Sequence, residues 1–320
     1  MSEITTPNRP PAPDWKTVTA GELVAYREAE NRWRASGAAR AILGEPHPGA
    51  AIDWQEVALP GRELPVRVYR PAPEPDGPGD DRSGLPLVIH VHGGGFVGTA
   101  AQSDWVNSHL AAQLPAVVVS VEHRLVDFDT PLPAAADDGW DVLRHVVGNA
   151  VRWGIDPARA AVFGESGGGL ICALAALRAK EAGLRLRAQV LVNPAVDVSE
   201  TMLDHASMTE HADTPTLTVP VLELFRRLAV PPGTDARTLS PLHADDLAGL
   251  VPALVVVPTH DPIADHGRRY AERLRAAGTP ARLTEYPGAG HAFLSLPGVD
   301  PQAEAARAEI HEFLRASLAA

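Results

Sequence analysis

Ser166 lies in the pentapeptide GESGG (164–168), between an apolar run typical of a strand (160–163) and a run typical of a helix (170–174). A serine on a tight strand-to-helix turn has a strained backbone, and the flanking glycines allow the strand and the helix to approach closely. The turn exposes the hydroxyl above the sheet edge, at the positive end of the helix dipole. This pattern predicts that Ser166 is the nucleophile of a serine hydrolase.

A second glycine-rich segment, HGGGF at residues 92–96, directly follows an apolar run at 87–91. Attack on a carbonyl needs amide donors directed at the developing oxyanion, and glycines let backbone N–H groups approach without an intervening side chain. We therefore expect the N–H groups of Gly93, Gly94 and Gly167 to form an oxyanion hole. A phosphate-binding loop is the alternative, but it would carry Lys-Ser or Lys-Thr before its helix, and this segment does not.

His291 is the best candidate for the base that a serine hydroxyl needs in order to attack. It lies in GAGHAF (288–293), in the expected loop between the last strand and the last helix, after small residues that leave the imidazole free to reach the sheet edge. Hydrolases with a serine on a strand-to-helix turn have the chain order serine, acid, histidine. Six other histidines follow the serine and fit less well: His205, His211, His243, His260, His266 and His311.

The acid that orients this histidine should follow the preceding strand, and Asp261 stands directly after the run at 254–257. A carboxylate there can accept the imidazole N–H and hold the required tautomer. The interval of 30 residues to His291 fits one helix and one strand. Asp265 is the rival, but we interpret it as the N-cap of the helix that follows.

Apolar runs alternate with helix-forming stretches along most of the chain, which predicts an α/β fold. The strand-like runs are 52–59, 64–69, 87–91, 117–121, 160–163, 189–192, 254–257 and 281–286. The helical stretches are 16–43, 103–114, 134–152, 168–182, 265–277 and 301–318. Valine-rich runs separated by amphipathic helices are typical of a parallel sheet covered on both faces. The rhythm breaks between Asp197 and about Leu250, where we expect helices laid over the carboxyl edge of the sheet.

The composition excludes several classes of function. The chain has 320 residues and a net charge of −12, which argues against a nucleic-acid partner or an anionic lipid surface. Its single cysteine, Cys172, allows no intrachain disulfide and no cysteine-based metal cluster. Residues 1–14 are expected to be disordered rather than a signal peptide, and no run approaches the roughly 18 apolar residues of a membrane helix. We expect a cytoplasmic protein without membrane insertion.

Four segments together resemble the hormone-sensitive-lipase-like (HGGG) family of carboxylesterases with the α/β-hydrolase fold. They are HGGGF at 92–96, GESGG at 164–168, DPIAD at 261–265 and YPGAGHAF at 286–293. The resemblance covers about residues 50–318. It implies a mostly parallel eight-stranded sheet with helices on both faces and a helical cap. It also implies hydrolysis of short- to medium-chain carboxylic esters, without a metal or a cofactor.

The same resemblance implies a division of the chain. Residues 1–50 would form N-terminal cap helices, residues 51–197 and 241–320 the catalytic core, and residues 198–240 a cap insertion. The substrate would bind against apolar side chains beside the glycine-rich loop and in the insertion, for which the candidates are Phe96, Met208, Leu217 and Phe225.

Four positions depart from the usual family pattern. His123 stands in place of tyrosine, Glu165 in place of the frequent aspartate, Gly167 in place of alanine, and Ala292 in place of glycine. None of these changes removes a catalytic group. The change at 123 is expected to affect the support of the oxyanion loop more than the triad.

These residues predict that Ser166 attacks the ester carbonyl, forms an acyl-enzyme and is released by water. An acyltransferase, a lactonase or an amidase would use the same triad, so these alternatives stay open. A non-catalytic receptor on this fold is less favoured, because His291 is present. Members of the family often form homodimers through the last strand and helix, here about residues 281–318, but the apolar residues of that helix equally fit its buried face.

Overall fold

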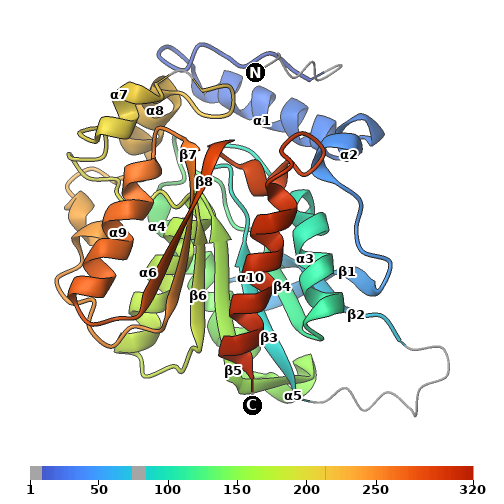
Figure 1. Ribbon diagram of the computed structural model, residues 1–320. Coiled ribbons are helices and arrows are strands. Elements are labelled where there is room, and N and C mark those ends of the chain that lie inside the picture. Colours follow the sequence, from blue (N-terminus) through green and yellow to red (C-terminus); the bar gives the residue numbers. More distant parts are fainter. Residues whose placement is uncertain (1–8, 74–83, 213, 320) are drawn as a thin grey trace.

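The computed structural model describes residues 9–73, 84–212 and 214–319, and its centre is one sheet of eight strands (Figure 1). The strands are β1 (Ala50–Leu59), β2 (Arg62–Pro71), β3 (Leu85–Val91), β4 (Val117–Val121), β5 (Ile155–Glu165), β6 (Ala188–Val192), β7 (Ala253–His260) and β8 (Ala281–Gly290). Their order across the sheet is β1-β2-β4-β3-β5-β6-β7-β8. Only β2 is antiparallel to its neighbours, and the other pairs are parallel. The expected mostly parallel eight-stranded sheet is therefore confirmed.

Helices cover both faces of this sheet, as the uninterrupted apolar strands require. They are α3 (Asp104–Gln113), α4 (Leu132–Gly148), α5 (Ala150–Trp153), α6 (Gly167–Glu181), α9 (Ala264–Ala276) and α10 (Ala303–Leu318). Alternate strand residues point to opposite faces: Leu87 and Ile89 share one core with α4, α6 and α9, whereas Val88 shares the other with α3 and α10.

The prediction of one helix over 134–152 is wrong, because two helices occupy this stretch. Pro131 takes the N-cap position and α4 starts at Leu132, where proline near a first turn is tolerated. Gly148 ends α4, and Asn149 leaves the helical conformation with φ −117° and ψ 35° before α5 begins.

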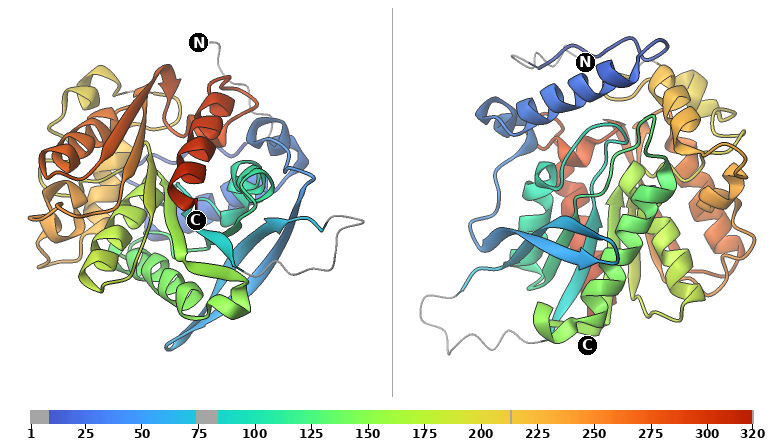
Figure 2. Two further views of the ribbon diagram at one scale, coloured as in Figure 1. Left: turned by 60° about the horizontal axis from the view of Figure 1, so that its bottom comes forward. Right: turned by 180° about the vertical axis from the view of Figure 1, so that it is seen from behind.

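Four helices lie above the carboxyl ends of the strands (Figures 1 and 2). They are α1 (Ala20–Arg34), α2 (Gly37–Leu43), α7 (Ala206–Glu210) and α8 (Val219–Ala229), and we call them the cap helices. A capping box starts α1, because Thr19 accepts from the Glu22 N–H and Glu22 accepts from the Thr19 N–H. None of the helices in the described part of the chain combines the length and apolar character needed to cross a bilayer.

Two buried histidines, His90 in β3 and His266 in α9, couple stability to pH. Burial lowers the pKa of His90 to about 3 and that of His266 to about 4. In the unfolded chain both titrate near the ordinary value of about 6.5. Between these limits the unfolded chain binds more protons than the folded protein. The free energy of unfolding therefore decreases as the pH falls from about 6.5 toward 4.

We expect each of these two histidines to lower the free energy of unfolding by about 1.4 kcal/mol per pH unit between pH 6 and 4. Urea unfolding at a series of pH values measures this slope. His266→Gln removes one of the two titrations, so its slope should be shallower by that amount. His260→Gln, at an exposed position, should keep the wild-type slope. Equal slopes for wild type and His266→Gln would contradict the assignment.

Candidate active site

Ser166 stands between the end of β5 and the start of α6, with φ 55° and ψ −118°. This backbone conformation is uncommon for a residue with a side chain and is typical of functional turns. The neighbouring glycines are required by space: a Cβ on Gly168 would lie 2.1 Å from the Val91 carbonyl oxygen, and one on Gly164 2.2 Å from the Gly168 oxygen. Strand and helix therefore approach as closely as the sequence pattern predicts.

The structure brings Ser166, His291 and Asp261 together in a continuous hydrogen-bonded chain. His291 Nε2 lies 2.8 Å from Ser166 Oγ, and His291 Nδ1 lies 2.8 Å from Asp261 Oδ2. Asp261 is fully buried, and its other oxygen accepts from the Ile263 N–H at 2.9 Å. A proton on Nδ1 directed at this carboxylate leaves Nε2 as the acceptor for the serine hydroxyl.

The rival acid, Asp265, is not the N-cap that we expected. α9 begins at Ala264 with Ile263 as its N-cap, so Asp265 lies inside the first turn. Its carboxylate accepts from the Ser207 N–H at 3.1 Å and pairs with Arg268 at 2.9 Å. Asp265 therefore connects α9 to the segment with Ser207 and leaves the contact with the imidazole to Asp261.

Gly93 and Gly94 lie beside the serine, as expected of oxyanion donors. A Cβ on Gly93 would be 3.4 Å from Ser166 Cβ, and Gly94 has φ 104°, which favours glycine. In the described part of the chain, the N–H groups of Gly93 and Gly94 donate to no protein acceptor. Gly167 is the first residue of α6, so its N–H has no partner within the helix. Three amide donors are thus available near one hydroxyl.

A cavity of about 440 Å³ opens at Ser166. Phe96, Leu217 and Phe225, three of the four expected substrate contacts, line it. The fourth expectation is corrected: Met208 is not among the lining residues, because α7 turns this side chain into the core, where it is 4 % exposed. The other apolar lining residues from α8 are Val221 and Leu222.

The cavity wall also contains residues that the sequence did not indicate, namely Arg9, Trp15, Tyr26 and Arg34 from the N-terminal region. Trp15 stacks on Phe96 with ring centroids 5.9 Å apart and meets Tyr26 edge-on at 5.4 Å. From the stretch that we expected to be disordered, Arg9, Pro10 and Ala12 line the cavity, whereas residues 1–8 lie outside the described residues. The capping box at Thr19 was the available signal for a helix start here.

Glu165, one of the departures from the family pattern, is buried behind the serine turn. It is 3 % exposed, and Ser295 Oγ donates to its Oε2. Burial raises the pKa of Glu165. Ala292, another departure, adopts the left-handed conformation with φ 63° that glycine would adopt without strain.

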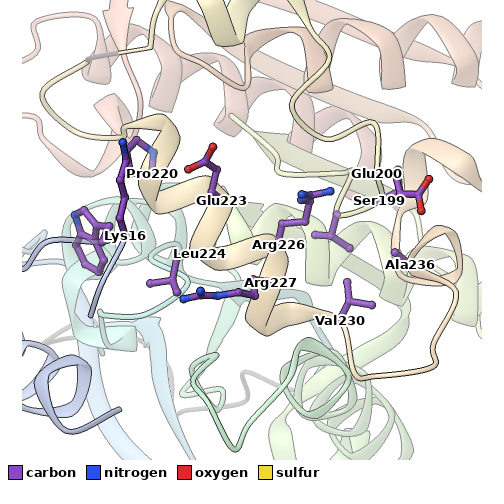
Figure 3. A pocket seen from close by; sticks show the side chains of 12 residues that line it. Lys16, Ser199, Glu200, Pro220, Glu223, Leu224, Arg226, Arg227, Val230 and Ala236 are labelled. Atoms are coloured by element: carbon purple, nitrogen blue, oxygen red, sulfur yellow. The ribbon is translucent and has the colours of Figure 1, made fainter. Parts of the chain in front are cut away.

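Ser199, which lines a groove of about 530 Å³ (Figure 3), belongs to a second group of serine, histidine and aspartate. His243 Nε2 lies 3.1 Å from Ser199 Oγ and 3.2 Å from Asp197 Oδ2. Both partners therefore meet the same ring nitrogen. An imidazole cannot pass a proton from serine while held by the carboxylate at that one atom, so this group does not form a triad.

His123, the third departure, lies behind the glycine-rich loop. Its Nε2 is 3.3 Å from the His92 carbonyl oxygen, its Nδ1 is 3.0 Å from the Arg124 carbonyl oxygen, and its ring stacks on His92 at 4.4 Å. Burial lowers the pKa of His123, so the imidazole is neutral near pH 7. The side chain supports the loop from the core side, as we expected from the sequence.

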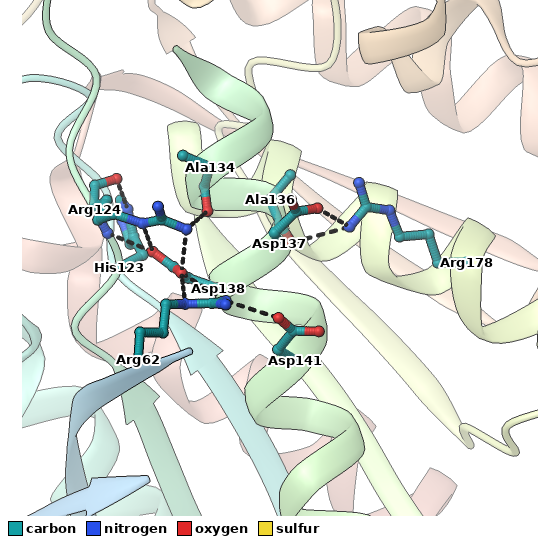
Figure 4. Close-up of polar contacts among 9 residues, drawn as sticks. All are labelled: Arg62, His123, Arg124, Ala134, Ala136, Asp137, Asp138, Asp141 and Arg178. Atoms are coloured by element: carbon teal, nitrogen blue, oxygen red, sulfur yellow. Dashed lines mark hydrogen bonds and ion pairs between the residues drawn. The ribbon is translucent and has the colours of Figure 1, made fainter. Parts of the chain in front are cut away.

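Next to His123, the buried carboxylate of Asp138 joins two arginines (Figure 4). Asp138 Oδ1 lies 2.8 Å from Arg124 Nη2 and 3.0 Å from Arg62 Nη2. Its Oδ2 also accepts from the Arg124 backbone N–H at 2.9 Å. Asp138 thereby fixes the segment that carries His123 to α4.

Asp138→Ala should therefore lower the free energy of unfolding by about 2–3 kcal/mol in urea titrations, because two guanidinium groups lose their shared partner. This is less than for a fully buried pair, since both arginines partly reach solvent. Asp137→Ala is the matched control: Asp137 pairs with Arg178 at the surface, and its loss should cost less than about 1 kcal/mol. Equal losses in the two variants would contradict the assigned role of Asp138.

Among the described residues, no group of three or more His, Cys, Asp or Glu side chains is arranged to hold a metal ion.

A family model described as alpha/beta hydrolase fold matches residues 88–295, which include Ser166, Asp261 and His291. This chain belongs to the alpha/beta hydrolase fold family.

Two relatives of this alpha/beta hydrolase are named as esterases. It is 38 % identical over 267 residues to Carboxylesterase NlhH of Mycobacterium tuberculosis. The aligned region covers 80 % of this chain and 79 % of the relative. It is 31 % identical over 275 residues to an arylesterase of Saccharolobus solfataricus. This aligned region covers 82 % of this chain and 83 % of the relative. A solved hyperthermophilic esterase from Pyrobaculum calidifontis superposes with a TM-score of 0.82 at 30 % identity, over 93 % of this chain and 94 % of that chain.

Proposed function

We propose that this alpha/beta hydrolase is a serine carboxylesterase that hydrolyses short- to medium-chain carboxylic esters through an acyl-enzyme on Ser166. The observation that carries the proposal is the chain of two 2.8 Å hydrogen bonds from Asp261 through His291 to Ser166, at the floor of a cavity with amide donors beside it. The names of the esterase relatives support the same chemistry.

In this mechanism Ser166 Oγ attacks the ester carbonyl while His291 Nε2 takes its proton. The oxyanion is stabilised by the N–H groups of Gly93, Gly94 and Gly167, which stand ready without reorganisation. His291 then protonates the leaving alcohol. Water, deprotonated by the same imidazole, attacks the acyl-enzyme and releases the acid, and the proton returns to Ser166. Asp261 holds the imidazole and stabilises its cationic form.

The cavity favours a small apolar substrate. Its volume of about 440 Å³ lies in the lower part of the range of ligand pockets, about 300–1,000 Å³. Phe96, Leu217 and Phe225 offer aromatic and aliphatic surface to an acyl or alcohol group. No described residue favours a lactone or an amide over an open-chain ester. Of the alternative activities, transfer to an added alcohol is an outcome of the test.

The test is a series of 4-nitrophenyl esters from acetate to palmitate, with product analysis in the presence of an added primary alcohol. We expect the highest kcat/KM for acetate, butyrate or hexanoate, and the free acid as the main product. The highest value on palmitate would contradict the proposed substrate class. An alkyl ester as the main product would identify an acyltransferase instead, and no turnover of any ester would contradict the activity.

A homodimer through β8 and α10 stays a prediction. β8 is an edge strand of the sheet, which supports pairing with a second copy. Ile310 and Leu314 of α10 are fully buried within their own chain, so they are not available for such an interface. Light scattering coupled to size exclusion measures the mass directly.

A further inference from the structure

The two amide donors of the glycine-rich loop are aimed by contacts on the opposite side of the loop. A trans peptide is planar, and its C=O and N–H point in opposite directions. A side chain that holds the carbonyl oxygen of one residue therefore directs the N–H of the next residue. His123 lies on the core side, with Nε2 3.3 Å from the His92 oxygen and Nδ1 3.0 Å from the Arg124 oxygen. A neutral imidazole has one N–H, so His123 directs the Gly93 N–H in this way only in the tautomer that carries the proton on Nε2.

The Gly94 N–H is directed from the cap side, through Gln102. Gln102 Nε2 donates to the Gly93 carbonyl oxygen at 3.0 Å, and its Oε1 accepts from Arg34 Nη1 at 2.8 Å. Gln102 is 6 % exposed, so water has little access to these bonds. Arg34 belongs to α1 and is itself fixed by Glu30 at 3.0 Å.

Two further residues of α1 hold the rest of the same loop. Asn31 exchanges two hydrogen bonds with Gly98, accepting from its N–H at 2.8 Å and donating to its oxygen at 3.3 Å. Arg27 Nε donates to the Phe96 oxygen at 2.8 Å. Arg27, Asn31 and Arg34 follow one another at intervals of four and three residues, which places them on one face of the helix.

The loop's own hydrogen bonds fix only part of its conformation. Gly94 and Gly98 adopt φ values of 104° and 111°, and glycine has more accessible conformations than any other residue. The internal Val97 N–H to Gly94 bond at 2.7 Å closes one turn. His92 Nδ1 of the loop itself lies 2.9 Å from the Gly93 oxygen, and the Val126 N–H donates to the Gly95 oxygen at 3.0 Å. Gln102, Asn31 and Arg27 add the side-chain contacts from outside the loop.

We propose that the face of α1 with Arg27, Asn31 and Arg34 positions the oxyanion-binding amides, with Gln102 as the connecting side chain. The N-terminal cap helix is then part of the apparatus that stabilises the transition state, as well as a wall of the cavity. This inference rests on the proposed esterase function. Asn31 and Gln102 are positioning residues, because they act through the backbone of the loop.

The test compares Gln102→Met and Asn31→Ala with Arg32→Ala, a control on the exposed face of the same helix, where the side chain is 71 % exposed. Active sites are counted by titration with diethyl 4-nitrophenyl phosphate, so that misfolded protein does not enter kcat. Loss of an oxyanion donor typically lowers kcat by about 10²–10³-fold, and we expect a misdirected donor to lower it by about 10–100-fold. KM for 4-nitrophenyl butyrate should stay near the wild-type value, and Arg32→Ala should resemble wild type in both constants.

A trifluoromethyl ketone, which forms a tetrahedral adduct with the serine, supplies a second readout. Its affinity should fall by the same factor as kcat/KM in both positioning variants, whereas a merely structural role would leave the affinity per active site unchanged. Gln102→Glu can still accept from Arg34 but cannot donate to the Gly93 oxygen, so it should lose as much as Gln102→Met. Wild-type kcat per titrated site in Asn31→Ala and both Gln102 variants would overturn the inference. The esterase proposal would survive that result, since it depends on Ser166.

Discussion

Ser166→Ala should lower kcat on 4-nitrophenyl acetate by about 10⁵–10⁶-fold, as much as the loss of the whole triad. Alanine removes the attacking oxygen, so no acyl-enzyme can form. The amides of Gly93, Gly94 and Gly167 remain and leave a residual rate above that of water. Initial rates at saturating substrate, with wild type diluted to the same signal range, measure the ratio.

The matched control for this replacement is Ser199→Ala. Ser199 also has a histidine and an aspartate beside it, but both contact one nitrogen of His243. The loss of the Ser199 hydroxyl should leave kcat within about twofold of wild type, because Ser199 does not line the cavity at Ser166. If activity were lost in Ser199→Ala and kept in Ser166→Ala, Ser199 and not Ser166 would be the nucleophile, and the account would be contradicted.

Asp261→Asn should lower kcat by about 10⁴-fold. In the wild-type protein, the Asp261 carboxylate accepts a hydrogen bond from His291 Nδ1. An amide donates at the same place, so the imidazole would carry its proton on Nε2 and could not accept the proton of Ser166. The volume and the burial of the side chain hardly change, and the loss therefore reports the tautomer. Steady-state kinetics on 4-nitrophenyl acetate give the value.

Asp265→Asn separates this role from a general loss of negative charge. Asp265 lies four residues after Asp261, in the first turn of α9, and its carboxylate pairs with Arg268. Its replacement should change kcat by less than about threefold, the range of surface ion pairs. Similar losses in Asp261→Asn and Asp265→Asn would show that the acid has not been identified.

The residues with a local signature could be predicted from the sequence. Ser166 is indicated by glycines that a strand-to-helix turn requires. Asp261 follows the apolar strand β7, and His291 follows the strand-like run at 281–286. Parallel strands bring their carboxyl ends to one edge, so the meeting of these three residues follows from the order of elements.

The cap could not be predicted in the same way, because its contacts join distant residues. Met208 and Phe225 are both apolar residues of the insertion, yet α7 turns Met208 into the core, whereas Phe225 of α8 lines the cavity. Gln102 and Asn31 carry no motif at all. Their bonds to the glycine-rich loop span 9 and 67 residues.

Reaction with diethyl 4-nitrophenyl phosphate, followed by mass spectrometry, tests the central claim most directly. An activated serine attacks phosphorus as it attacks a carbonyl, but the phosphoryl-enzyme is hydrolysed slowly. We predict one diethylphosphoryl group per chain, on the peptide that contains Ser166, with esterase activity lost in proportion to labelling. The Ser166→Ala protein should gain no mass. A label on any other residue, or full activity in fully labelled protein, would contradict Ser166 as the nucleophile.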